Sequence, residues 1–187
     1  MSKQDIKQGT LLAPLPVVFV SCGDMENSNV LTVAWTGIVN SDPPMCYISV
    51  RKQRHSHKML ETTREFAINM PSSNLTRRLD KAGVISGKNV NKFEELHLHK
   101  EDLKFVKCPG IAECPIILEC KVREITNLGS HDMFLADIIN VKVDEDLITK
   151  SGKIDFTKAD LVAYSHGEYF KLGNKLGKFG YSVKKRK

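Results

Sequence analysis

The chain has 187 residues, of which 41% are hydrophobic and 27% charged, and these values argue against a disordered, fibrous or collagen-like protein. Its formal net charge is +6, which is modest for its length. No apolar run approaches the roughly 18 residues of a membrane span, and no apolar stretch follows a basic N-terminus, so we expect neither a membrane segment nor a signal peptide.

The excess positive charge is concentrated at the C-terminal end. Residues 171–187 contain seven of the 28 Lys and Arg residues and no acid, which leaves 21 basic against 22 acidic residues in the rest of the chain. The final KKRK sequence at 184–187 is typical of a flexible, solvated terminus. Nucleic-acid binding through this tail is the weaker alternative.

The first part of the chain has the pattern of strands separated by turns. Residues 15–22, 30–39 and 45–50 are β-forming segments, and 23–29 and 40–44 have the composition of turns. The second turn contains two prolines, each of which disfavours helix at the residue before it.

The sequence NVLTVAW at 29–35 has an unusual spacing of polar and aromatic groups. Asn29, Thr32 and Trp35 recur at intervals of three residues, which match neither the period of a strand nor a full turn of an amphipathic helix. Trp35 is the only tryptophan in the chain. These three side chains are therefore candidates for contacts with a ligand.

The middle of the chain is predicted to contain two helices around a strand. Ser56 is the expected N-cap of a helix over 57–65, residues 66–70 form a strand, and a second helix over 72–83 ends at Gly83. Between these helices and the next clear strand the sequence is mixed and suggests loops with one short helix.

The second half of the chain contains the clearest strand periodicity. Apolar and polar residues alternate over 116–122, and 133–143 follows after a short connection, so the two segments predict a long hairpin. The glycines in the last part of the chain argue against a stable helix there. With no long flexible linker, residues 1–187 are expected to form one domain, mainly β with inserted helices (α+β), folded as a closed or half-closed antiparallel barrel.

Three other sets of residues bear on the chemistry. The five cysteines are odd in number and contain no CxxC pair, so we expect reduced thiols in a cytoplasmic protein. The six histidines do not have the spacing of a metal site, so we assign no metal ligands. The sequence also lacks the GxSxG, Walker and GxGxxG motifs. The candidate aromatic groups for packing on a flat ring are Trp35, Tyr164, Tyr169 and Phe170.

Positive charge collects where a predicted strand meets a predicted helix. The sequence SVRKQRHSHK at 49–58 contains four Lys or Arg residues and two histidines but no acid. The N-terminus of a helix presents free N–H groups and a partial positive charge, so this segment is a candidate phosphate site. A solvated basic loop explains the same residues equally well.

His131, in the sequence GSHDMF, is a candidate general acid, ligand or hydrogen-bond donor to a heterocycle. An ordinary exposed turn residue is the alternative. Together with the aromatic groups and the basic segment, it suits a flavin or nucleotide better than a peptide.

Six segments, in this order, resemble the flavin reductase-like family and especially its flavoredoxin branch. The resemblance runs from about residue 13 to 183 and implies an FMN-binding split β-barrel, with one non-covalent FMN per subunit near the interface of a homodimer. The segments are PLPVVFVSCGD…NVLTVAWTG…SDPPMCYISV, FAINMP, GSHDMFLADIINV and YSHGEYFKLGNKLGKFGYSV.

The same resemblance assigns the candidate site residues. It implies phosphate contacts in the basic segment, a basic group directed toward the cofactor from the NKF sequence, aromatic groups beside the ring, and a catalytic histidine near flavin and nicotinamide. The implied residues are Asn29, Thr32, Trp35, Thr36, Arg51, His55, Ser56, Lys58, Lys92, His131, Tyr164 and Tyr169.

One departure from the family pattern bears on function. Stand-alone flavin reductases usually have small hydroxyl residues where this chain has TVAW, and the indole of Trp35 is expected to restrict release of FMN. The favoured function is therefore a flavoredoxin-type electron carrier, an oxidoreductase with a redox protein or pyridine nucleotide as partner. The alternative is an NAD(P)H:flavin oxidoreductase that supplies reduced flavin to another enzyme, with NADH or NADPH as co-substrate.

Overall fold

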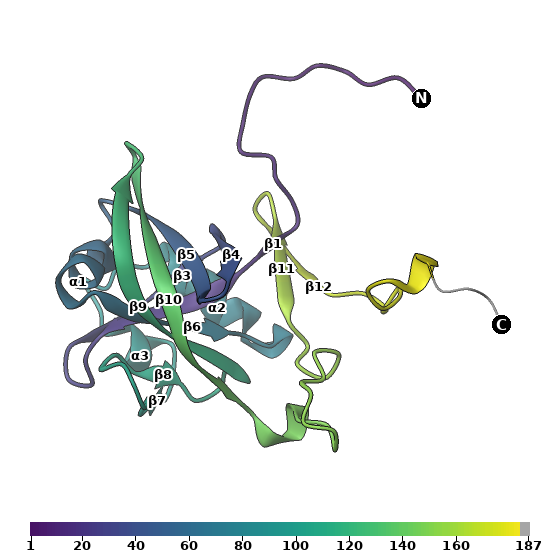
Figure 1. Ribbon diagram of the computed structural model, residues 1–187. Coiled ribbons are helices and arrows are strands. Elements are labelled where there is room, and N and C mark those ends of the chain that lie inside the picture. The colour runs from purple at the N-terminus through teal and green to yellow at the C-terminus, as the bar shows by residue number, and fades with distance from the viewer. Residues whose placement is uncertain (184–187) are drawn as a thin grey trace.

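The computed structural model describes residues 1–183, and the predicted basic tail at 184–187 lies outside the described residues. Within them the main element is a seven-stranded antiparallel sheet with the order β3–β2–β6–β9–β10–β5–β4 (Figure 1). Its strands are β2 (Val18–Gly23), β3 (Ser28–Val33), β4 (Thr36–Ser41), β5 (Pro44–Arg51), β6 (Glu65–Met70), β9 (Ile116–Asn127) and β10 (His131–Val143).

Helices and two small sheets surround the main sheet. The helices are α1 (His55–Thr63), α2 (Thr76–Val84), α3 (Lys92–Glu95) and the 3-10 turns η1 (Ser73–Leu75), η2 (Glu145–Leu147) and η3 (Tyr181–Val183). The small sheets contain β1 (Leu15–Pro16), β11 (Val162–Ser165) and β12 (Glu168–Lys171), and β7 (Lys100–Glu101) with β8 (Gly110–Ile111). No helix within residues 1–183 is long and apolar enough to cross a membrane.

The main sheet is curled because its two edge strands are consecutive in the chain. Only Ala34 and Trp35 separate β3 from β4, although these strands lie at opposite edges of the sheet. Three steps along an extended chain cover at most about 11 Å, so the two edges must approach each other at this point. The backbone N–H of Ser49 on β5 donates to the carbonyl of Trp35 at 2.9 Å and fixes the crossing. The predicted half-closed barrel with inserted helices is confirmed.

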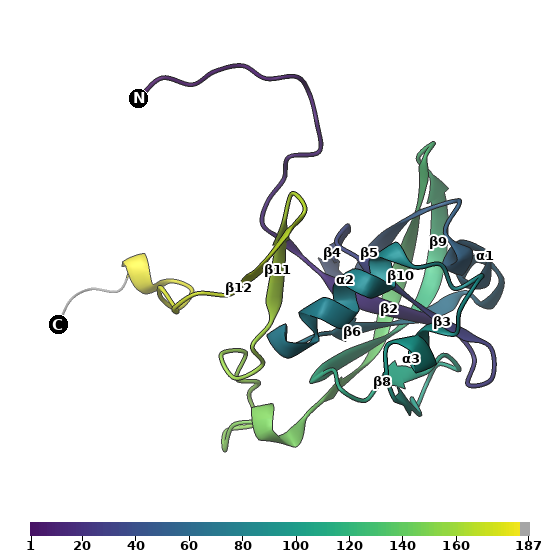
Figure 2. The same cartoon turned by 180° about the vertical axis from the view of Figure 1, so that it is seen from behind.

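Two apolar clusters pack on the two sides of β2, all six residues of which are buried. Val20 packs with Leu60 of α1 and Phe134 of β10 in the interior of the barrel. On the other side, Phe19 packs with Leu79 of α2 and with α3. Figure 2 shows α2 and α3 in front of the sheet when the molecule is seen from behind.

Three local predictions are corrected by the structure. The segment predicted as one strand over 30–39 is two strands, because the chain crosses the barrel opening at Ala34 and Trp35. Arg54, and not Ser56, is the N-cap of α1. Gly83 lies inside α2 and does not end it, and a Cβ at this position would come within 3.2 Å of the Thr32 Cβ, so the glycine allows close packing of α2 on β3.

Buried polar side chains of the barrel hold the irregular segment at 102–111. Ser21 donates to the carbonyl of Pro109 at 2.6 Å, and Asn69 accepts from the backbone N–H of Ile111 at 2.8 Å. Glu119, which is fully buried, accepts from the backbone N–H groups of Phe105 at 2.6 Å and Val106 at 3.2 Å. Backbone groups outside regular secondary structure lack the hydrogen bonds of a helix or sheet, and these buried side chains supply partners for them instead.

We predict that Glu119→Gln lowers the free energy of unfolding by about 1–3 kcal/mol, the cost of leaving a buried polar group unsatisfied. The amide nitrogen of glutamine cannot accept the N–H groups that both carboxylate oxygens accept in the structure. Denaturant unfolding followed by far-UV circular dichroism measures the change. Glu124→Gln, at an exposed position of the same strand, is the control, and equal stabilities for the two variants would contradict this role of Glu119.

Candidate functional site

The open side of the barrel contains a continuous cleft made of two adjoining cavities of about 380 and 410 Å³. Leu31, Arg51 and Arg54 line both cavities and join them. We call the cavity beside α1 and Lys92 the basic end, and the cavity beside Trp35 and Tyr164 the aromatic end.

The basic end contains the N-terminus of α1. Within the described residues no side chain caps this helix, and its first turn contains no acid. The first N–H groups of the helix therefore add their partial positive charge to that of Arg51 and Arg54 in the wall of the cavity. Arg54 is held in place by a hydrogen bond from its Nη1 to the carbonyl of Gly83 at 2.8 Å.

Asn29 and Ser56 form the buried floor of the basic end. The amide Nδ2 of Asn29 on β3 donates to the hydroxyl of Ser56 on α1 at 2.6 Å. Gly87 packs directly over this pair, and a Cβ at that position would lie 2.2 Å from the Asn29 Oδ1. Only glycine leaves room for the amide, so the loop after α2 closes tightly against the floor of the cavity.

Lys92 brings a buried ammonium group to the same cavity. Its side chain is buried, and its Nζ donates to the carbonyl of Ala82 at 2.6 Å. Burial, and secondarily the positive charge of Arg54, lower the pKa of Lys92 to about 8, with a smaller opposite effect from Cys22. An ammonium has three N–H donors, so the group keeps donors for an anion in the cavity.

Trp35 and His131 form one wall of the aromatic end. Their ring centroids lie 4.7 Å apart at an interplanar angle of 32°. The Nδ1 of His131 lies 2.9 Å from the hydroxyl of Ser130. Partial burial, and secondarily the positive charge of Arg51, lower the pKa of His131, which favours the neutral imidazole at pH 7.

Two tyrosines of the small sheet form the opposite wall. Tyr164 and Tyr169 make an edge-to-face contact with centroids 5.5 Å apart. The hydroxyl of Tyr169 donates to Asp80 Oδ1 on α2 at 3.0 Å. Burial, with the nearby carboxylate, raises the pKa of Tyr169, so its phenol stays protonated as the donor. On the strand side, Thr32 donates its hydroxyl to the carbonyl of Leu79.

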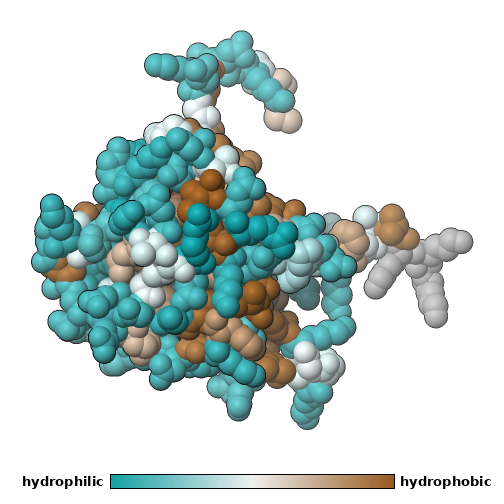
Figure 3. Space-filling model, turned by 60° about the vertical axis from the view of Figure 1, so that its left-hand side comes forward, coloured by the Kyte–Doolittle hydropathy of each residue, from teal (hydrophilic) through white to brown (hydrophobic). Residues whose placement is uncertain are grey.

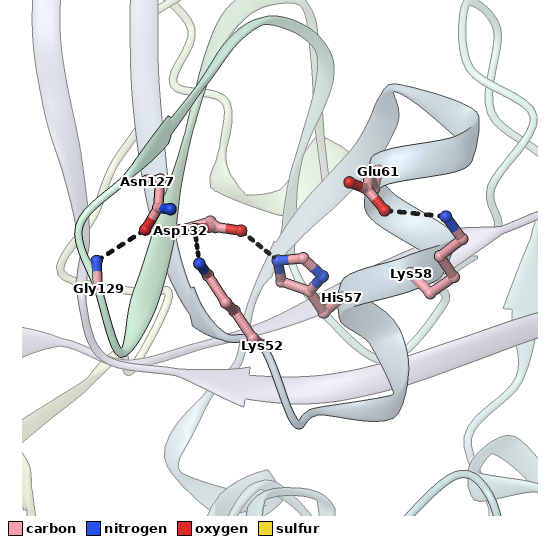
Figure 4. A network of polar contacts seen from close by, with 7 residues as sticks. All are labelled: Lys52, His57, Lys58, Glu61, Asn127, Gly129 and Asp132. Carbon is pink, nitrogen blue, oxygen red and sulfur yellow. Dashed lines mark hydrogen bonds and ion pairs between the residues drawn. The ribbon is translucent and has the colours of Figure 1, made fainter.

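The structure brings most of the residues predicted from the sequence to this cleft. Two of the predicted residues lie elsewhere: the hydroxyl of Thr36 is buried and donates to the carbonyl of Tyr47 at 2.6 Å, and Lys58 pairs with Glu61 at 3.0 Å on the exposed face of α1 (Figure 4). The cleft residues are Asn29, Thr32, Trp35, Arg51, His55, Ser56, Lys92, His131, Tyr164 and Tyr169.

Sequence reasoning missed Arg54, Asp80 and Gly87 as cleft residues. Arg54 belongs to the basic segment and the same charge signal identifies it. Asp80 reaches the cleft from a helix that carries no motif, and nothing in the sequence connects it with Tyr169. Among residues 1–183, no group of three or more His, Cys, Asp or Glu side chains is arranged to hold a metal ion.

Comparisons with known proteins agree with this architecture. An uncharacterized protein of Archaeoglobus fulgidus is 31% identical over 159 residues, covering 85% of this chain and 88% of the relative. The solved flavoredoxin of Desulfovibrio vulgaris (Miyazaki F) is similar with a TM-score of 0.91 and 31% identity, covering 98% of this chain and 100% of that one. Flavoredoxin from Methanosarcina acetivorans gives a TM-score of 0.84 and 26% identity, covering 97% and 100%.

The family resemblance stated from the sequence is confirmed by a match over nearly the whole described chain. Residues 11–173 match the family model described as "Flavin reductase like domain". The match includes every residue of the cleft. The chain therefore belongs to the flavin reductase-like family of oxidoreductases and flavin-binding proteins.

Proposed function

We propose that this protein is a flavoredoxin-type flavoprotein that carries electrons on one non-covalently bound FMN. The observation that carries the proposal is the composition of the cleft, in which a cationic cavity with free helix N–H groups joins a cavity walled by aromatic rings. FMN has a phosphate at one end and a flat three-ring system at the other. The similarity to solved flavoredoxins supports the same assignment.

The basic end fits the phosphate in charge and in donor type. Lys92 and Arg51 supply cationic donors, and the N–H groups of His55 and Ser56 supply neutral ones. Asn29 would hold Ser56 in place through the hydrogen bond from its Nδ2 to the Ser56 hydroxyl. An anion here would restore favourable surroundings for the buried ammonium of Lys92.

The aromatic end fits the ring system. Trp35 and Tyr164 offer flat surfaces, and His131 offers a hydrogen-bond donor that is neutral at pH 7. Bound FMN supplies the redox chemistry, since its ring takes up and releases electrons. The role proposed for His131 is to stabilise negative charge that develops on the ring, as a donor aimed at that charge does in general.

Trp35 is the reason to favour a tightly held FMN over one that exchanges freely. Its backbone carbonyl is held by the N–H of Ser49, and its ring packs on the ring of His131, so the indole leaves this position only by giving up the contact with His131. A release-competent reductase needs an exit path for the flavin. We therefore retain the NAD(P)H:flavin oxidoreductase only as the alternative that the first experiment below separates.

We further propose that two copies of the chain associate in the cytoplasm. Apolar side chains remain exposed on the N-terminal segment, on the edge strand β4 and after β12, and Figure 3 shows apolar patches on a mostly hydrophilic face. All five cysteines, which lie within the described residues, are unpaired and buried. The exposed apolar residues are Leu11, Leu12, Ile38, Val39, Phe170, Leu172, Leu176 and Phe179.

The first test is the absorbance spectrum of the purified protein with FMN, before and after anaerobic addition of NADH or NADPH. We expect stoichiometric flavin bands that persist with either nucleotide and bleach with dithionite or reduced ferredoxin. Prompt bleaching by a nucleotide, with turnover of free flavin, would favour the reductase alternative. A protein that takes up no FMN would overturn the proposal.

We predict that FMN affinity falls at high pH because Lys92 loses its proton. In the free protein this lysine has a pKa of about 8, and a bound phosphate would raise it, so binding above pH 8 requires proton uptake. The affinity should fall by a factor approaching ten per pH unit above about pH 8, and should be flat between about pH 7 and 8. Fluorescence titration of FMN measures it.

The matched variant for this test is Lys92→Met, which keeps the buried aliphatic stem and removes the charge. It should bind FMN more weakly at pH 7 and lose the fall in affinity above pH 8. A wild-type affinity that is constant to about pH 9.5 would contradict the role of Lys92 as a phosphate ligand.

We predict that His131→Ala lowers the midpoint potential of the bound flavin by about 30–65 mV, the equivalent of one lost hydrogen bond to a charged group in a two-electron couple. The donor that would stabilise the reduced ring is absent in this variant, whereas the fold should be retained because His131 is only half-buried. Potentiometric titration measures the shift. His99→Ala, outside the cleft lining, is the control, and equal potentials for both variants would refute the role of His131.

A further inference from the structure

A polar cluster of Lys52, His57 and Asp132 lies outside the lining of the cleft, where α1 meets the end of the β9–β10 hairpin (Figure 4). The Nε2 of His57 lies 2.7 Å from Asp132 Oδ2, and the Nζ of Lys52 lies 3.4 Å from Asp132 Oδ1. His57 and Asp132 are only 9% and 8% exposed. Because an ionised carboxylate only accepts, the imidazole is the donor in the shorter contact.

Neither His57 nor Asp132 lines either cavity, but each is the chain neighbour of a residue that does. His57 follows Ser56 in the floor of the basic end, and Asp132 follows His131 in the wall of the aromatic end. Adjacent side chains of a strand point to opposite faces, so Asp132 points away from the cleft into which His131 points. The pair can therefore influence a ligand only through the two backbones that it joins.

The contact joins parts of the chain that are 75 residues apart. The ring of His57 also makes an edge-to-face contact with Phe134 of the same strand, with centroids 5.4 Å apart. Figure 1 shows that the β9–β10 hairpin extends beyond the neighbouring strands, and its turn is closed locally by a hydrogen bond from the Gly129 N–H to Asn127 Oδ1 at 2.8 Å. Asp132 is thus the polar anchor of this hairpin end on α1.

We propose that His57 and Asp132 are positioning residues that set the spacing between the two ends of the cleft and thereby make it selective for a phosphorylated flavin. The proposal rests on the FMN-binding function proposed above. A ligand that occupies both ends obtains the full binding free energy of both only when their spacing is fixed before it binds. Otherwise part of that free energy is used to order the two ends. A ligand that fills the aromatic end alone does not sense that spacing.

Riboflavin provides the necessary comparison, because it has the ring and ribityl chain of FMN without the phosphate. If the pair sets the spacing, breaking it reduces FMN affinity and leaves riboflavin affinity nearly unchanged. If the pair only stabilises the fold, its loss changes both affinities by the same factor or changes neither. The ratio of the two dissociation constants is therefore the informative quantity.

The main variant is His57→Phe, which keeps an aromatic ring against Phe134 and removes the donor to Asp132. The second variant is His57→Phe/Asp132→Leu, which replaces both members of the pair by apolar groups. This double replacement leaves no unpaired buried carboxylate and is often neutral for stability. Asp132→Asn retains an acceptor for the imidazole and serves as the conservative variant. Glu61→Gln, which removes an exposed ion pair from the same helix, is the matched control.

Fluorescence titrations should show FMN affinity about tenfold or more weaker in both pair-breaking variants, the loss expected for one charge-assisted hydrogen bond, with riboflavin affinity within about twofold of wild type. Asp132→Asn keeps a neutral acceptor for the imidazole and should lose less FMN affinity than the pair-breaking variants, whereas Glu61→Gln should retain the wild-type ratio. If His57→Phe fails to fold, the double variant gives the same test.

Two outcomes would overturn the inference and are distinguishable from failure of the proposed function. A wild-type protein that binds FMN and riboflavin equally well would show that the cleft does not select for phosphate. An unchanged ratio in the folded pair-breaking variants would show that the pair does not set the spacing. A wild-type protein that binds neither flavin would instead overturn the FMN-binding function itself, and the inference with it.

Discussion

The crossing of the chain from one edge of the sheet to the other at Ala34 and Trp35 is the constraint on which the architecture depends. Two residues cannot span an open seven-stranded sheet, so the sheet must curl until its edges meet. The cleft lies along the resulting opening, and Trp35 stands in its wall because it is part of the crossing. The position of the indole is therefore already explained by the topology of the sheet.

Buried polar groups of the barrel serve two different purposes. Ser21, Asn69 and Glu119 bond to the backbone of 102–111, and also to other side chains, Asn69 to Ser21 and Asn140 to Glu119. Lys92 is equally buried but donates to only one carbonyl among the described residues, and its pKa is lowered accordingly. The first three residues complete the hydrogen bonding of the fold. Lys92 instead holds a buried positive charge without a negative partner in the basic end, a charge that a bound anion would neutralise.

The sequence supports the fold better than the details of the cleft. The alternation of apolar and polar residues over 118–122 predicts the strand of the hairpin. It does not predict burial, because the segment 102–111 also covers the second face of β9 and buries Ile117 and Glu119 there. The three-residue spacing of Asn29, Thr32 and Trp35 is not a structural period, since Asn29 bonds to α1, Thr32 bonds to α2 and Trp35 lies beyond the end of β3. Pairs such as Tyr169 with Asp80, which are 89 residues apart, leave no local signal in the sequence.

The two ends of the cleft are built in different ways, and this difference bears on how function can vary in this architecture. The basic end is made from backbone N–H groups and buried side chains that are packed against the barrel core. The aromatic end is closed by Tyr169 of the small sheet through one hydrogen bond to Asp80. Tyr169 is only partly buried against the core and Asp80 is exposed, so changes there should disturb the core less than changes at the buried Asn29 or Lys92. Under the function proposed above, preference for a redox partner or substrate can diverge at the aromatic end while recognition of a phosphate at the basic end is preserved.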